Sequence, residues 1–187
     1  MSLQKPPTEY IVQLQKELSL LNPEKIVVLA EKMRELQGTN RRLFLAGNGG
    51  SSATASHAAC DLGKTILPYS SRGSIKAVCL SDNIPLLTAW GNDSGYEFVF
   101  SEQLRNLATK DDFFMVISSS GNSPNILKAI TVAKELGIET FGLLGFDGGK
   151  AKDMVDDYLL VPVNDYGITE DIHMMTIHAV TDALKHE

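Results

Sequence analysis

Two segments of the chain bring together histidine and carboxylate side chains at spacings that suit metal binding or proton transfer. His57 and Asp61 are four residues apart, which places both on one face of a helix about one turn apart. Near the other end of the chain, Glu170, His173 and His178 lie within one short helical segment. An imidazole beside a carboxylate can move a proton or hold a divalent cation. For His57 and Asp61 taken alone, an ion pair on a helix surface is the structural alternative.

The spacing of Glu170 and His178 limits how they can act together. They are eight residues apart, so on a straight helix their backbones differ by about 12 Å in height and roughly 80° in direction. One helix could bring both to a single ion only with nearly fully extended side chains. If both are ligands, we expect them to come from different subunits or from a distorted helix, which would make assembly a condition of activity.

A turn rich in hydroxyl groups is the second candidate site, and it reads Ser118-Ser119-Ser120-Gly121-Asn122-Ser123, followed by Pro124. Such a turn offers free backbone amides and hydroxyl donors, and a proline suits the first turn of a helix whose N-terminus carries the positive end of the dipole. Together these groups can solvate a phosphate without Lys or Arg. The turn therefore favours phosphate as its ligand, and a capped turn without a ligand is the structural alternative.

A glycine-rich turn at residues 47–52 could be taken for a nucleotide site. It begins Gly-x-Gly, but Ser52 stands where the last Gly or Ala of the dinucleotide fingerprint belongs, and the acid near the end of the next strand, Asp82, is too far along the chain to bind a ribose. Residues 145–151 have neither the spacing nor the Ser or Thr of a P-loop. The sequence disfavours both kinds of nucleotide site.

The elements that position these residues follow from alternating apolar and helical patterns. Apolar runs predict five strands, at residues 42–46, 74–80, 113–117, 140–144 and 158–163, and helical spacing predicts helices after the glycine-rich turn to about residue 65, at 125–136 and at 168–184. Mostly apolar strands that alternate with helices indicate a parallel sheet covered on both faces. Ligands bind such sheets outside the carboxyl ends of the strands, where we expect both turns to lie.

We predict one α/β domain over residues 1–187. Residues 1–39 form two amphipathic N-terminal helices, at 8–21 and 23–38, which extend the domain or form an oligomer interface, and residues 40–187 form the α/β core.

Composition excludes several classes of protein. The formal net charge is −6 and no run of Lys or Arg forms a stripe, which argues against nucleic-acid binding, although a small anion needs only a local positive field. Cys60 and Cys79 cannot make a disulfide framework, so reduced thiols in a cytoplasmic protein are the simplest interpretation. Because no apolar stretch suits a signal peptide or a membrane span, we expect a cytoplasmic protein without membrane partners.

In their order and spacing, these motifs resemble the sugar isomerase (SIS) domain family, and most closely its phosphoheptose isomerases. The resemblance runs from about residue 42 to 183. It rests on the segment 47–51 with His57 and a carboxylate four residues on, on Gly-Asn-Asp-x-Gly-Tyr at 91–96, on the segment 117–123, and on Glu-Asp-x-His at 170–173 with His178.

The resemblance implies a single SIS domain with a five-stranded, flavodoxin-like parallel sheet, and a homotetramer with active sites between subunits. It implies a zinc cofactor and an aldose–ketose isomerisation, most closely that of sedoheptulose 7-phosphate to D-glycero-D-manno-heptose 7-phosphate through an enediolate. Carried over by position, the sugar-binding residues are Asn48, Gly49, Gly50, Ser51, Asn92, Asp93 and Glu170, and the phosphate-binding residues are Ser118, Ser119, Ser120 and Ser123. The zinc ligands are His57, Asp61, Glu170 and His178, and the acid/base pair is Asp61 and His178.

Two positions depart from the family's pattern. Asp61 stands where the family usually has Glu, and the shorter side chain needs the substrate or the helix nearer for proton transfer. Glu170 stands in place of the usual Gln, and its added charge should tighten a hard cation and make a bound water less acidic. The alternative from another class is a non-catalytic SIS protein, either a phosphosugar-binding regulator or a scaffold of the replication-initiator-associating kind. An imidazole and a carboxylate at both acid/base positions favour the enzyme over the scaffold.

Overall fold

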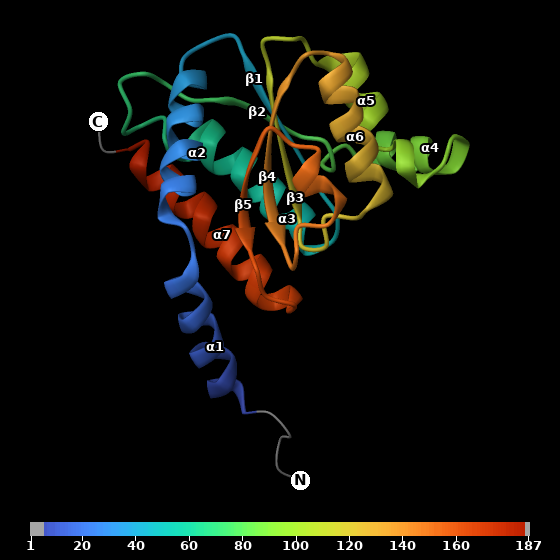
Figure 1. The fold of residues 1–187 in the computed structure, drawn as a ribbon. Helices are drawn as coiled ribbons and strands as arrows, with labels where there is room; N and C mark the ends of the chain where they lie inside the picture. Colours follow the sequence, from blue (N-terminus) through green and yellow to red (C-terminus); the bar gives the residue numbers. More distant parts are fainter. Residues whose placement is uncertain (1–5, 186–187) are drawn as a thin grey trace.

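A five-stranded parallel sheet forms the centre of the molecule in the computed structural model, which describes residues 6–185 (Figure 1). The predicted domain limits of 1–187 therefore include a few residues outside the described range. The strand order is β2-β1-β3-β4-β5, with bounds β1 Arg42–Gly47, β2 Lys76–Cys79, β3 Phe113–Ser118, β4 Glu139–Gly145 and β5 Asp157–Val161. This is the flavodoxin-like order, in which the chain reverses direction across the sheet between β1 and β3.

Helices cover both faces of the sheet, as the alternating pattern predicts (Figure 1). On one face lie α2 (Pro23–Leu36), α3 (Gly50–Cys60) and α7 (Tyr166–Ala183), and on the other lie α5 (Ser101–Leu107) and α6 (Pro124–Glu135). Helix α4 (Ile84–Asp93) projects beyond α5 and α6. Short 3-10 turns occupy Tyr96–Phe98 (η2) and Lys150–Asp153 (η3).

The strands hold the sheet rigid because they are buried on both faces. In β1, Leu43 and Leu45 pack toward α2, α3 and α7, whereas Phe44 packs toward α5 and α6. All six residues of β3 are buried. Burying one Leu or Phe side chain stabilises the fold by roughly 1.5–3 kcal/mol. The ends of β1 and β3 are therefore fixed platforms for the turns that follow them.

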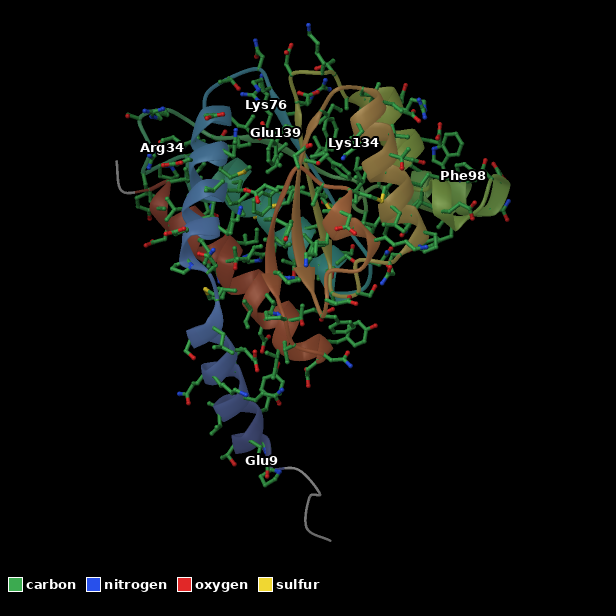
Figure 2. The ribbon with its side chains drawn as sticks, in the orientation of Figure 1. Glu9, Arg34, Lys76, Phe98, Lys134 and Glu139 are labelled. Atoms are coloured by element: carbon green, nitrogen blue, oxygen red, sulfur yellow. The ribbon has the colours of Figure 1, made fainter. Side chains whose placement is uncertain are left out.

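The two predicted ligand-binding turns lie side by side at the carboxyl edge of the sheet. Lys76 and Glu139 begin β2 and β4 and mark the opposite, amino edge (Figure 2). At the carboxyl edge, the Asn48 and Asn125 side-chain amides donate to each other's oxygens, both at 2.9 Å. This reciprocal pair connects the turn after β1 to the start of α6.

Helix α1 (Pro7–Leu20) extends past the carboxyl edge of the sheet (Figure 1). It is fastened to α7 by Tyr10, whose hydroxyl donates to Asp171 Oδ2 at 2.7 Å. Ile11 and Val12 are exposed, at 55% and 65%. Helix α1 thus presents apolar side chains that no other part of residues 6–185 covers.

The predicted elements are present, with ends that differ by a few residues. Strand β5 stops at Val161 rather than 163, because Pro162 has no amide to donate. Helices α4 and α5 are not predicted from the sequence. The helix after the glycine-rich turn changes at Asp61 into a π-helical turn, η1 (Asp61–Thr65), in which Ile66 N donates to Asp61 O at 3.2 Å. Across the described part of the chain, no helix is long and apolar enough to span a bilayer.

Candidate active site

The serine-rich turn between β3 and α6 is stabilised by hydrogen bonds between its own residues. Ser118 Oγ accepts from Gly121 N at 3.1 Å, and Ser120 Oγ accepts from Asn122 N at 3.3 Å. Gly121 has a φ of +60°, and a side chain there would overlap the carbonyl of Gly148. The turn is therefore folded so that only glycine fits at its tightest point.

The turn lines a pocket of about 130 Å³, called here the serine pocket. Its walls come from the ends of β1 and β3, from the starts of α3 and α6 and from the first turns of α7, and they comprise Asn48, Ser51, Ile117, Ser118, Ser119, Ser120, Ser123, Tyr166 and Glu170. Ser123 is the N-cap residue of α6, so the positive end of that helix faces the pocket wall. Ser119 Oγ is buried and has no hydrogen-bond partner within residues 6–185. The described lining contains hydroxyls and amides but no Lys or Arg.

The loop after β4 supports the serine turn from behind. Ala151 N donates to Gly121 O at 2.9 Å, and Lys150 N donates to the side-chain oxygen of Asn122 at 3.1 Å. Asn122 Nδ2 in turn donates to Ser120 O at 2.9 Å. These bonds fix the backbone of the turn before any ligand arrives.

Glu170 reaches the serine pocket from α7 and lies against Gly50, the first residue of α3. A Cβ atom at position 50 would come to 2.5 Å from Glu170 Cδ and 2.6 Å from Oε1, so only glycine leaves room for this carboxyl group. Burial, and to a smaller extent the charge of Asp171, raises the pKa of Glu170. The serine pocket thus contains one carboxyl group, which is easier to protonate than an exposed glutamate.

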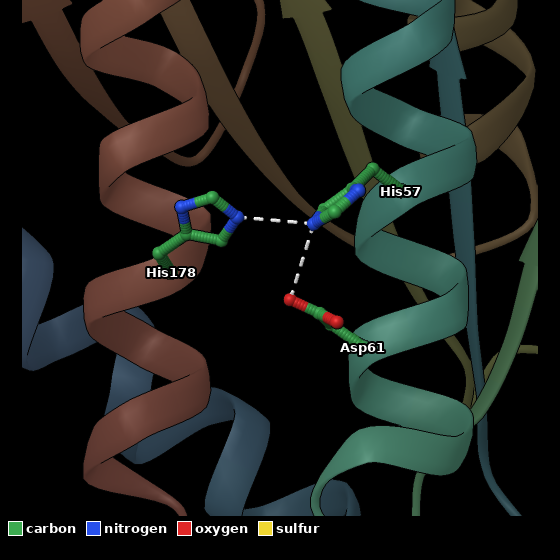
Figure 3. A group of neighbouring side chains, drawn as sticks. All are labelled: His57, Asp61 and His178. Atoms are coloured by element: carbon green, nitrogen blue, oxygen red, sulfur yellow. Dashed lines mark hydrogen bonds and ion pairs between the residues drawn. The ribbon is translucent and has the colours of Figure 1, made fainter.

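A separate cluster, called here the His–Asp–His group, joins α3 to α7 (Figure 3). His57 Nε2 lies 3.0 Å from His178 Nε2 and 3.3 Å from Asp61 Oδ2. The two imidazole rings meet edge to face, with their centroids 5.0 Å apart. The group is open to solvent beside a hollow lined by Asp61 and His178 among others.

These three side chains fit a zinc ion. In a tetrahedral zinc site, bonds of about 2.0–2.1 Å place neighbouring ligand atoms about 3.3 Å apart. The separations of 3.0 Å and 3.3 Å between the facing atoms of the group match that value. Two imidazoles and a carboxylate are also the donor set that suits zinc. Such an ion would have an open fourth position.

Glu170 does not belong to this group in the single chain. The group comprises His57, Asp61 and His178, whose ligand atoms lie within 4.8 Å of one another. Along α7, Glu170 is eight residues before His178, which separates their backbones by about 12 Å and roughly 80° around the helix. The chain thus contains two separate groups, the serine pocket and the His–Asp–His group, and the predicted role of Glu170 as a zinc ligand stays a prediction.

Asn92 and Asp93 end helix α4 and do not line the serine pocket. Asn92 Nδ2 donates to Asp93 Oδ1 at 2.7 Å. The nearest connection to the pocket is Tyr96, whose hydroxyl donates to Asn48 Oδ1 at 3.1 Å. Their predicted contact with a sugar also stays a prediction.

One residue of this region, Tyr166, was not predicted from the sequence, and one histidine that the sequence did single out, His173, is buried. Tyr166 lines the serine pocket; its position four residues before Glu170 on one helix was the available signal. His173 has no exposed surface, and burial lowers its pKa to about 4, with the backbone of Leu144 offsetting part of that effect. His173 is therefore neutral at physiological pH.

The fold, the serine pocket and the His–Asp–His group together define a class of protein, and comparison with known families confirms this class. The sequence model of the SIS domain matches residues 8–145. The chain belongs to the SIS domain family.

Within this family, the relatives found include phosphoheptose isomerases. The enzyme from Trichlorobacter lovleyi is 39% identical over 161 residues, which cover 86% of this chain and 81% of that protein. The enzyme from Helicobacter pylori strain P12 is 41% identical over 145 residues, covering 77% of this chain and 74% of that protein. The solved structure of the phosphoheptose isomerase from Neisseria gonorrhoeae matches with a TM-score of 0.83 and 33% identity over 92% of this chain and 91% of that one. The structure from Francisella tularensis matches with a TM-score of 0.87 and 28% identity, covering 95% and 94%.

Proposed function

We propose that this protein is an aldose–ketose isomerase of phosphorylated sugars that converts sedoheptulose 7-phosphate to D-glycero-D-manno-heptose 7-phosphate. One observation carries the proposal. The same chain contains a serine pocket whose hydroxyl groups suit a phosphate and a His–Asp–His group that suits proton transfer. The similarity to phosphoheptose isomerases, over most of the chain, supports the enzyme rather than a non-catalytic scaffold.

The serine pocket binds the phosphate. The hydroxyls of Ser118, Ser119, Ser120 and Ser123 and the N-terminus of α6 supply donors to its oxygens. Asn48, Gly49, Gly50 and Ser51 meet the adjoining sugar hydroxyls from the turn after β1, and Asn92 and Asp93 approach from α4. Binding energy from the phosphate end holds the reacting carbons in place.

Asp61 and His178 carry the proton transfers. One of them removes the proton from the carbon beside the carbonyl group of the open-chain sugar, which leaves a cis-enediolate. The other moves a proton between the two neighbouring oxygens, and reprotonation of the second carbon completes the exchange of aldehyde and ketone. Asp61 is shorter than Glu, so the substrate must approach α3 closely.

His57, Asp61 and His178 would hold the zinc ion. When bound, zinc supplies Lewis-acid stabilisation of negative charge on the substrate oxygen. His57 lies against both His178 and Asp61 and so helps to hold their side chains in place.

The complete site forms between protomers of a homotetramer. The serine pocket of one protomer faces the His–Asp–His group of a neighbour, and the separation of these two groups along and around α7 in one chain supports this arrangement. Glu170, the fourth ligand that the resemblance implies, would then come from the neighbouring protomer. The exposed apolar side chains of α1, among them Ile11, Val12 and Leu20, suit burial against a second copy. We place this assembly in the cytoplasm, with no nucleic-acid or membrane partner.

The proposal is tested by turnover of sedoheptulose 7-phosphate by the wild type, Asp61→Asn and His178→Gln, with the zinc content measured for each. We expect turnover by the wild type, and a loss of at least about a hundredfold in each variant, the usual range for general acid–base groups. Full turnover by both variants would refute the assigned roles. A wild type loaded with zinc that turns over no heptose phosphate would refute the activity.

Mixing two inactive variants tests the shared site separately. Ser120→Asp disables the serine pocket, and His178→Gln disables the His–Asp–His group. If each site draws one half from each protomer, random mixed tetramers at equal amounts regain roughly a quarter of the wild-type sites. No recovery in tetramers shown by mass spectrometry to be mixed would place both halves in one chain.

A further inference from the structure

Phe146, in the loop behind the serine turn, has an unusual backbone conformation. Its φ is +54°, and among residues 6–185 it is the one non-glycine residue with a positive φ. A side chain with a Cβ atom is disfavoured there, and a bulky one especially so. Strained residues of this kind persist where the surrounding structure holds them, often at functional sites.

The loop around Phe146 is fixed to the serine turn. Gly149 N donates to Asp147 Oδ1 at 3.0 Å, and Lys150 N donates to the side-chain oxygen of Asn122 at 3.1 Å. Gly149 also has a positive φ and packs against the carbonyl of Ser120. The position of Phe146 relative to the serine pocket is therefore set by the backbone on both sides.

The ring of Phe146 packs against Tyr166. Their centroids are 4.9 Å apart and the rings are inclined by 74°, the edge-to-face arrangement that aromatic pairs favour. Tyr166 is the first residue of α7 and is 61% exposed, so little else restrains its ring. Phe146 thus restrains the side chain of Tyr166 at the edge of the pocket.

The pair separates two hollows of the surface. Tyr166 lines the serine pocket, whereas Phe146 lines a neighbouring hollow with Asp147, Pro162 and Asn164. Apart from Ile117, the other described residues lining the serine pocket are polar. Tyr166 is therefore the large apolar surface that a ligand in this pocket can contact.

We propose that Phe146 and Tyr166 form an aromatic wall of the serine pocket that recognises the carbon chain next to the bound phosphate. The ring of Tyr166 packs against the C–H groups of that chain, and Phe146 is a positioning residue that holds the ring there. The hydroxyls of the serine turn recognise the phosphate, and the wall distinguishes a phosphate ester from inorganic phosphate. The identity of the ester rests on the proposed function.

The test compares dissociation constants for sedoheptulose 7-phosphate and for inorganic phosphate, by calorimetry and phosphorus NMR, in the wild type, Tyr166→Ala, Tyr166→Phe and Phe146→Gly. We expect Tyr166→Ala and Phe146→Gly each to weaken binding of the sugar phosphate by about threefold to tenfold, the contribution of one aromatic contact. Binding of inorganic phosphate should stay within about twofold, because the proposed wall contacts the carbon chain and the hydroxyls of the serine turn hold the phosphate. Tyr166→Phe retains most of the affinity, because the ring rather than the hydroxyl makes the contact.

The melting temperature separates positioning from a merely structural role. Glycine adopts a positive φ without strain, so Phe146→Gly should not lower the melting temperature although it weakens sugar binding. The double variant Phe146→Gly/Tyr166→Ala should bind sedoheptulose 7-phosphate no more weakly than Tyr166→Ala alone, because Phe146 acts through Tyr166. Tyr69→Ala is the matched control, since Tyr69 is 64% exposed and lies after η1.

Three results would overturn the inference. Unchanged sugar phosphate affinity in Phe146→Gly would remove the positioning role, and unchanged affinity in Tyr166→Ala would remove the wall. An equal loss for inorganic phosphate would show that the rings support the serine turn instead. A wild type that binds inorganic phosphate but not the sugar phosphate overturns the proposed substrate and the wall together, whereas wild-type binding with unaffected variants overturns only the wall.

Discussion

Replacing Gly50 with alanine tests whether the position of Glu170 matters for the reaction. The new Cβ atom would lie 2.5 Å from Glu170 Cδ, whereas ordinary contacts of such atoms begin at 3.4 Å. The carboxyl group must therefore move by about 1 Å or turn out of the serine pocket. A misplacement of about 1 Å can reduce turnover by about a hundredfold, so we expect kcat/KM for sedoheptulose 7-phosphate to fall by about tenfold to a hundredfold.

The fold itself should not suffer from this substitution. Gly50 lies in α3 without a positive φ, and alanine favours a helix over glycine by up to about 1 kcal/mol. We therefore expect the urea midpoint of Gly50→Ala to equal or exceed that of the wild type. Turnover is measured with a coupled assay for the heptose phosphate, and unfolding is followed by circular dichroism.

Two further variants complete the design. Gly91→Ala is the matched control, since a Cβ there meets nothing closer than Val99 Cγ1 at 3.8 Å. Adding Glu170→Asp to Gly50→Ala shortens the displaced side chain and should recover part of the lost activity. Full turnover by a folded Gly50→Ala protein would refute the reasoning, because it would show that the carboxyl group is free to leave the pocket.

Three predictions concern ionisation and metal binding. Burial raises the pKa of Glu170, so the folded chain keeps a proton that the unfolded chain has already lost, and stability falls as pH rises from the unfolded value of 4.5 to the raised folded value. Urea titrations should show Glu170→Gln more stable than the wild type at neutral pH, with the difference gone below pH 4.5. Burial lowers the pKa of His173 to about 4 from 6.5. Between these two pH values the unfolded chain binds a proton that the folded chain does not, so the free energy of unfolding falls as pH falls. The loss amounts to roughly 3 kcal/mol by pH 4, and urea titrations of His173→Phe should not show it. Zinc should raise the melting temperature of the wild type in a concentration-dependent way, whereas His57→Gln and His178→Gln should respond weakly; an equal rise in all three proteins would place the ion elsewhere.

The strands could be predicted because a strand that is buried on both faces has a continuous run of apolar residues in the sequence. Runs such as the one around Phe114 are apolar without alternation, and all of β3 is buried. Helix α4 was not predicted because none of its residues is buried, so no apolar face marks it, and because it contains Pro85 and Gly91. Its start depends instead on a local cap, where the Asn83 side chain accepts from Leu86 N at 3.1 Å.

Only the local half of the site could be predicted from spacing. The pairing of His57 with Asp61 follows from one helical turn, and it is present at 3.3 Å. The meeting of His57 with His178 depends on how α3 packs against α7, which no short-range pattern encodes. The position of Glu170 against Gly50 likewise depends on tertiary packing. The spacing did indicate that Glu170 and His178 cannot easily meet at one ion within a single helix.

The π-helical turn at Asp61–Thr65 has a consequence for how the gene of such a protein can change in length. The turn is closed by a bond from Ile66 N to Asp61 O, one residue longer than an α-helical turn. Deleting one codon after Asp61 would remove the extra residue and restore a regular helix, with the residues beyond the turn in nearly the same orientation, while His57 and Asp61 would keep their places at the end of α3. The turn can therefore absorb a change of one residue in length without moving either the path to β2 or the side chains of the preceding helical turn.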